Sequence, residues 1–285
     1  MSILLALVPS ILWGLYSLVI PKIGGSSEQQ TLGVTLGALL FALVTFPFTP
    51  HNYNVTNVIV SLVSGFIWAF GCLYQVKSFK EMGVSRTIPI TTGMQLIGTS
   101  LVGVLFLHEL GTPAALGFGA VALVAFIIGI TCTSYSEKTE ASNSLGKGML
   151  FVTISSVAII IYVVLIELFK VNSFDVVLPQ SIGMVLGALA VSIKSSEKRF
   201  CKKTAELMLP GILWAAGNLV MFYSNSSLGV AISFPLSQLG LVISTIGGVL
   251  FLKEAKTKKE KIAVGIGLIF VFLGVILIGF AKSVQ

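Results

Sequence analysis

The chain alternates long apolar stretches with short polar connections. Each stretch of about 18 to 23 apolar residues is long enough to cross ~30 Å of hydrocarbon as a helix, which rises about 1.5 Å per residue. The pattern therefore predicts an all-α polytopic membrane protein with ten transmembrane helices. We expect the spans at residues 3–20, 31–48, 57–77, 84–107, 113–134, 147–168, 176–193, 207–224, 230–252 and 262–281.

The sequence contains an internal repeat. The run Gly-Val-Leu-Phe-Leu-x-Glu ends once at Glu109 and again at Glu254. A duplicated five-helix ancestor explains such a repeat. We expect a first repeat over residues 1–139 and a second over 140–285, both within one transmembrane bundle. Other residues keep a similar offset, namely Trp68 with Trp214, Gly71 with Gly217, Gly83 with Gly229 and Pro89 with Pro235.

Lys and Arg residues break the symmetry of the two repeats. Because five is an odd number, the second repeat has to enter the membrane inverted, and matched connections then face opposite sides. Of the 18 Lys and Arg residues, 16 lie in odd-numbered connections, and the two exceptions are Lys170 and Lys282. Cytoplasmic connections are rich in Lys and Arg. We therefore predict inverted repeats, odd connections in the cytoplasm and both termini outside.

Composition narrows the class of protein further. The 285 residues are 55% hydrophobic and 10% charged, which places the chain in the cell membrane and leaves no separate soluble domain. The net charge of +7 follows from topology, so it does not indicate a nucleic-acid partner. The first span lacks a basic leader and a cleavage site, and we expect it to be retained. Hydrolase and phosphate-binding motifs, paired cysteines and metal-ligand spacings are absent, which predicts a non-enzyme without metal or cofactor.

Polar residues inside the spans are mainly amides, hydroxyls and indoles. A buried amide needs hydrogen-bond partners that hydrocarbon does not supply, so these residues are candidates for a ligand site. The alternative is structural, because Ser, Thr, Asn and Gln also join membrane helices, and glycines spaced four apart, as at Gly33 and Gly37, permit close packing. The candidate substrate-binding residues are Trp68, Gln95, Asn218, Gln238, Trp214, Thr91, Ser237 and Trp13.

Pro89 and Pro235 interrupt matching spans of the two repeats. Each proline removes one helical hydrogen bond and frees a carbonyl four residues earlier, at Ser85 or Ala231. Interruptions at matching positions of two halves point to a binding site or a hinge.

Three further residues are candidates for a gate or for coupling to an ion. Gln30 and Gln180 begin matching spans, where they could either line gates or cap helices. Glu167, near the end of a span, is a candidate proton site, although a carboxylate at a helix end is often solvated or paired. Charged side chains are otherwise absent from the span interiors, which favours an uncharged cargo. Amides can exchange hydrogen bonds with sugar hydroxyls, while indoles can cover the apolar face of a pyranose.

Several longer strings resemble a known family. The chain resembles the drug/metabolite transporter superfamily through Leu12-Trp13-Gly14 and the duplicated five-helix plan. Within it, the bacterial glucose uptake permeases of the glucose/ribose porter family are similar over essentially the whole chain. The resemblance implies ten helices around a central cavity and uptake of glucose or a related sugar by proton symport. The strings are Thr91 to Leu96, Gln180 to Met184, Gly217 to Ser224, Ser237 to Leu239 and Ser244 to Gly248.

Two other functions remain open from the sequence. A related carrier could export amino acids or other small metabolites, and a non-transporting sensor or scaffold could also span the membrane. The duplicated, proline-interrupted spans favour a secondary transporter with alternating access, whose partners are a neutral sugar, a proton and the lipid bilayer.

Overall fold

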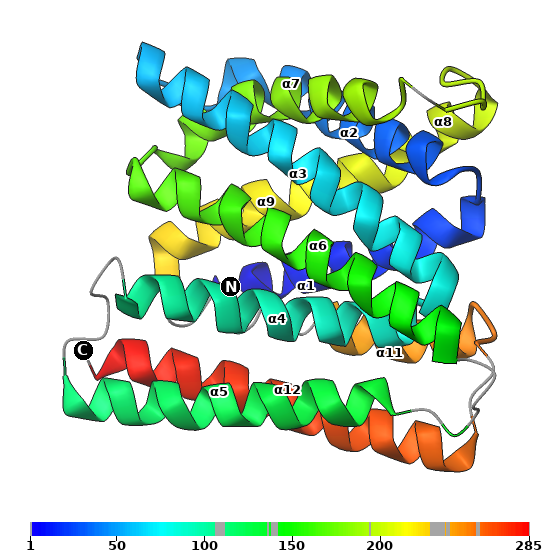
Figure 1. The fold of residues 1–285 in the computed structure, drawn as a ribbon. Coiled ribbons are helices and arrows are strands. Elements are labelled where there is room, and N and C mark those ends of the chain that lie inside the picture. Colours follow the sequence, from blue (N-terminus) through cyan, green and yellow to red (C-terminus); the bar gives the residue numbers. More distant parts are fainter. Residues whose placement is uncertain are drawn as a thin grey trace.

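The computed structural model describes residues 2–105, 112–135, 137, 142–193, 195–228, 237, 240–254 and 257–284, and these ranges contain helices and no strand. Figure 1 shows how these helices are arranged. Their bounds are α1 Ser2–Ile23, α2 Ser27–Thr45, the 3-10 turn η1 Phe46–Phe48, α3 Val55–Met82, α4 Val84–Leu105, α5 Pro113–Ser134, α6 Ser142–Leu168, α7 Ser173–Val191, α8 Lys202–Glu206, α9 Met208–Leu228, α11 Gly240–Leu250 and α12 Lys258–Ser283.

Seven segments within the described ranges are long and apolar enough to cross a membrane. The chain is therefore a multi-pass membrane protein. Two shorter apolar helices, Leu7–Ile23 in α1 and Gly240–Leu250 in α11, accompany them. The seven segments are Ser27–Phe48, Val55–Met82, Pro113–Thr133, Leu145–Ile166, Phe174–Val191, Lys202–Met221 and Lys258–Ala281.

The odd-numbered connections meet at one end of the bundle. The Lys80 ammonium lies 3.0 Å from the carbonyl oxygen of Gly25, which joins the third connection to the first. Lys147 forms an ion pair with Glu81 at 2.8 Å, which joins the fifth connection to the third. We call this the basic end, because these connections carry most of the Lys and Arg residues.

The even-numbered connections meet at the opposite end. The backbone N–H of Asn52 donates to the Asp175 carboxylate at 2.6 Å, which joins the connection after η1 to the start of α7. The Thr112 hydroxyl donates to the carbonyl of Val284 at 3.1 Å. The C-terminal end of α12 therefore lies beside the start of α5, and these two helices run side by side (Figure 1).

Glycines set the closest helix contacts. At each of four glycines a Cβ atom would lie only 2.0 Å from a backbone carbonyl oxygen of a neighbouring helix, far inside van der Waals contact. The backbones of α2 and α9, and those of α3 and α7, therefore touch directly. The glycine and carbonyl pairs are Gly37 with Met208, Gly211 with Val34, Gly65 with Gln180 and Gly183 with Leu62.

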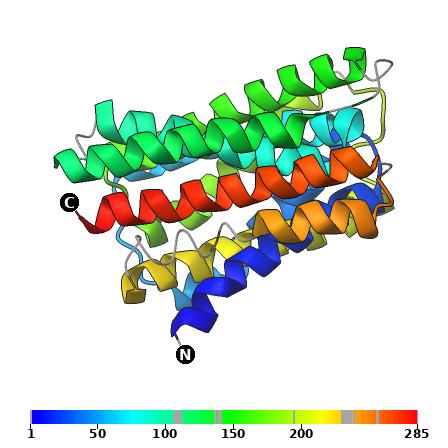
Figure 2. The same cartoon turned by 90° about the horizontal axis from the view of Figure 1, so that it is seen from below.

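The N-terminal helix packs against elements from the other half of the chain. α1 contacts α9 and α11, and Figure 2 shows α1 and α11 lying next to each other. A Cβ at Gly14 would lie 2.7 Å from the Ile243 Cβ, so this crossing is also close. α4 contacts α11 as well and continues as a helix through Pro89. These contacts place α1, α3, α4, α6, α9 and α11 around the candidate residues.

Candidate functional site

Three tryptophans from three helices form one cluster. The rings of Trp68 on α3 and Trp214 on α9 lie 4.6 Å apart between centroids, tilted by 51°. The indole N–H of Trp13 on α1 donates to the backbone carbonyl of Trp214 at 3.3 Å. Trp68 is only 4% exposed and belongs to the largest buried apolar cluster. The sequence repeat paired two of these residues, and the structure brings all three together.

The small residue at position 217 makes this arrangement possible. A Cβ at Gly217 would lie 2.5 Å from the Trp13 indole nitrogen, so any larger residue would displace that ring. Gly217 lies one helical turn after Trp214, on the same face of α9. The glycine therefore positions the Trp13 indole against the backbone of α9.

Asn218 gives the cluster a polar side. It follows Gly217 on α9, is partly buried, and shares a side-chain hydrogen bond with the Tyr162 hydroxyl of α6. Tyr162 packs against the same apolar cluster as Trp68 and Trp214. Sequence reasoning missed Tyr162, although a single phenol in the apolar run before Glu167 was a usable signal. Indole faces, an amide and a phenol together can bind a molecule that has both apolar and hydroxyl-rich faces.

Gln180 lies in a buried chain of hydrogen bonds beside this cluster. Its amide donates to the Ser64 hydroxyl at 3.0 Å, and that hydroxyl donates to the Tyr162 backbone carbonyl at 3.0 Å. These hydrogen bonds join α7, α3 and α6, and they end at Tyr162, the residue whose side chain bonds Asn218. Gln30, in contrast, donates to the carbonyl of Gly25 at 3.2 Å in the connection that precedes α2. Gln30 and Gln180 therefore each donate a side-chain hydrogen bond to another residue of the protein.

The remaining candidates lie on α4, at position 237 or outside the described atoms. Thr91 on α4 is buried, and its hydroxyl donates to the Thr87 carbonyl at 2.7 Å. Gln95 is partly buried one turn further along α4, and Ser237 is buried. Gln238 lies outside the described residues, as does the side chain of Glu167.

Comparison with known proteins identifies the family. Residues 4–281 match the Sugar transport protein family. The chain belongs to this family of sugar transport proteins. It is 49% identical to a candidate sugar uptake protein of Listeria monocytogenes, with 99% of this chain and 100% of that protein covered. It is 42% identical to the glucose uptake protein GlcU of Bacillus subtilis, with 99% of each chain covered.

A solved crystal structure shares the fold of this sugar transport protein. The TM-score is 0.62 at 14% sequence identity, over 100% of this chain and 98% of that chain. The family consists of transporters, so the chain is a transporter and not an enzyme.

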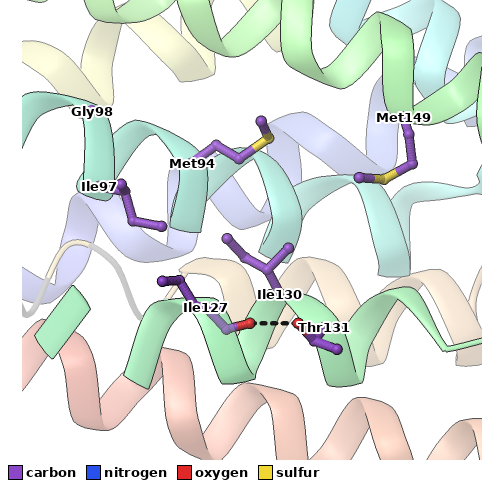
Figure 3. Close-up of a pocket in the computed structure, with 7 residues that line it drawn as sticks. All are labelled: Met94, Ile97, Gly98, Ile127, Ile130, Thr131 and Met149. Atoms are coloured by element: carbon purple, nitrogen blue, oxygen red, sulfur yellow. Dashed lines mark hydrogen bonds between the residues drawn. The ribbon is translucent and has the colours of Figure 1, made fainter. Parts of the chain in front are cut away.

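One cavity among the described residues does not suit a sugar. It measures about 350 Å³ and lies between α4, α5 and α6 (Figure 3). Its one hydroxyl, on Thr131, already donates to the Ile127 carbonyl at 2.8 Å. A sugar placed there would lose its hydrogen bonds to water without replacing them. Ile127 is 57% exposed, so this cavity opens on the outer face of the bundle toward lipid. The lining residues are Met94, Ile97, Gly98, Ile127, Ile130, Thr131 and Met149.

Proposed function

We propose that this sugar transport protein imports glucose or a related neutral monosaccharide. The main support is the cluster of three tryptophans beside the Asn218 and Tyr162 pair, where α1, α3, α6 and α9 come together. Indole faces can cover the C–H face of a pyranose, and the amide can exchange hydrogen bonds with its hydroxyls. The name of the Bacillus subtilis relative supports glucose as the first substrate to test.

We further propose that ten transmembrane helices form two inverted repeats, over residues 1–139 and 140–285. Helix packing supports this proposal. If α2 corresponds to α7 and α3 to α9, then a two-fold axis maps the pair α2–α9 onto the pair α7–α3. Both pairs are in contact, and both touch through glycines that approach backbone carbonyls. The pairs α5–α12 and α4–α11 map onto themselves and are also in contact.

Such repeats suit alternating access, in which the two halves rock around a central site. We propose proton symport as the driving mechanism, with Glu167 as the candidate proton site. Gln30 and Gln180 remain candidates for gate residues at the two membrane faces. In this proposal Gln95, Thr91, Ser237 and Gln238 extend the site along the proline-interrupted helices.

Uptake of labelled glucose with and without a protonophore tests the mechanism. We expect cells expressing the chain to accumulate glucose, and we expect the protonophore to abolish accumulation while leaving downhill exchange intact. Accumulation that survives collapse of the proton gradient would remove proton symport from the proposal. Efflux of amino acids without any glucose uptake would instead favour an exporter.

The orientation in the membrane has its own test. The basic end is proposed to face the cytoplasm, so the C-terminus, at the opposite end beside Thr112, faces outward. We expect an alkaline phosphatase fused after Gln285 to be active and a green fluorescent protein fused there to stay dark. The reverse pattern would contradict the orientation.

A further inference from the structure

At the basic end, one carboxylate of the second half holds the start of α4 in the first half. The Glu254 side chain accepts the backbone N–H of Val84 at 2.6 Å and that of Ser85 at 3.2 Å. It also accepts the Ser85 hydroxyl. Backbone N–H groups at a helix start have no partner within the helix, and the helix dipole favours a negative charge there. Glu254 therefore supplies from another element the cap that α4 lacks in its own sequence.

The surrounding backbone is built to admit this carboxylate. Gly83, which precedes α4, has a φ of 81°, and a Cβ there would lie 2.8 Å from the Glu254 carboxyl carbon. A Cβ at Gly248 on α11 would lie 2.9 Å from the Ser85 backbone nitrogen. Lys253 has a φ of 54°, a conformation that costs energy in a residue with a side chain. Two glycines and one strained residue thus bring Glu254 to the start of α4.

A second carboxylate holds the next residue of α4. Arg86 forms an ion pair with Glu260 of α12 at 3.1 Å, and their side chains are only 11% and 6% exposed. Glu260 also accepts the backbone N–H of Thr257, in the capping box that begins α12. Three consecutive residues at the start of α4 are therefore held by two carboxylates of the second half. We call these contacts of Glu254 and Glu260 with residues 84–86 the α4 clamp.

We propose that the α4 clamp is the closed gate at the basic end and that it must open in each transport cycle. This inference rests on the proposed function. The clamp joins α4 to the residues that follow α11, and these two helices belong to different halves and are in contact. Pro89 has no N–H for the Ser85 carbonyl, so the first turn of α4 is held less firmly to the rest of its helix. Ionic contacts at a membrane face can also exchange for water, unlike an apolar contact.

A reversible crosslink tests the gate directly. In a chain whose Cys72, Cys132 and Cys201 are changed to Ser, we pair Ser85→Cys with Gly248→Cys. A Cβ at position 248 would lie 3.0 Å from that of Ser85, so a small shift reaches the roughly 3.5–4.5 Å of a disulfide. We expect oxidation to lower glucose uptake at least tenfold and reduction to restore it. Oxidation should not change the uptake rate of either single-cysteine variant relative to the same variant before oxidation.

Unchanged uptake by fully crosslinked protein would overturn the gate. Should the double variant fail to fold, the accessibility of Val84→Cys gives an independent measurement, because Val84 is 1% exposed and binds Glu254 only through its backbone. We expect Glu254→Gln to raise the modification rate of this cysteine by a water-soluble thiol reagent several-fold. An equal rate with and without Glu254→Gln would also overturn the gate.

The matched control is Glu206→Gln. The Glu206 side chain is 48% exposed and forms an ion pair with Lys202, one turn away on α8. This control should leave the modification rate of Val84→Cys unchanged. Thiol modification needs no sugar, so it separates the two proposals. A wild-type chain that carries no glucose would refute the proposed function, while the response of Val84→Cys to Glu254→Gln would still decide the gate.

Discussion

Replacing Asn218 with Ala is expected to lower glucose uptake by about tenfold to a hundredfold, because a polar partner lost in a buried site costs roughly 1–3 kcal/mol. The amide is partly buried, and the change removes its hydrogen bond with Tyr162 together with the proposed contact to a sugar hydroxyl. Initial rates of labelled glucose uptake measure the effect. Immunoblots of the membrane fraction correct each rate for the amount of protein.

Two further variants make this result specific. Tyr162→Phe keeps the ring that packs against the tryptophans but removes the hydroxyl that bonds Asn218, so we expect a smaller loss that appears mainly as a raised KM. Thr131→Ala changes the hydroxyl of the lipid-facing cavity and should leave uptake within about twofold, since that hydroxyl already bonds its own helix. Wild-type uptake by Asn218→Ala would remove this residue from the site.

Replacing Gly65 or Gly183 with Ala is expected to destabilise the bundle by about 1–3 kcal/mol or more, since overpacking forces backbones apart. At each position the new methyl would lie 2.0 Å from a carbonyl oxygen on the facing helix, and backbone cannot rotate away as a side chain can. We expect lower yields of folded protein and a lower Tm in detergent. Thermal unfolding followed by size-exclusion chromatography measures both.

Gly117→Ala and Gly265→Ala are the matched controls. These glycines lie within α5 and α12, and a Cβ at either one meets nothing within 4 Å. We expect Tm to stay the same or to rise slightly, because Ala is the better helix former by about 0.5–1 kcal/mol. If all four variants lose stability equally, helix propensity and not helix contact would explain the result, and the α3–α7 crossing would have to be revised.

Apolar length predicted where the helices lie, but not where they end. The sequence pattern predicted a span at 57–77, whereas α3 runs from Val55 to Met82. The ends are set by other physics, because the Asn54 side chain caps the first turn and Gly83, at positive φ, ends the last. The short polar helix α8 escaped the prediction for the same reason, since it contains no apolar stretch.

The sequence repeat predicted one contact of the candidate site. It matched Trp68 with Trp214, and the rings of these two residues lie 4.6 Å apart between centroids in the structure. Tyr162 could not be placed in this way, because its contact with Asn218 depends on how α6 crosses α9. The sequence identified Glu254 only as an acidic residue at a helix end. Glu254 contacts Val84 and Ser85, which lie 170 and 169 positions earlier in the chain, and these contacts depend on the packing of α11 against α4.

Counterflow of labelled glucose into proteoliposomes tests the central claim most directly, because it needs neither metabolism nor an ion gradient. Vesicles that hold the purified chain are loaded with unlabelled glucose and diluted into a trace of labelled glucose. We expect a transient accumulation of label with the wild type and little or none with Asn218→Ala. Label that enters these vesicles no faster than it enters protein-free liposomes, or equally fast with Asn218→Ala, would contradict a glucose carrier with its site at the tryptophan cluster.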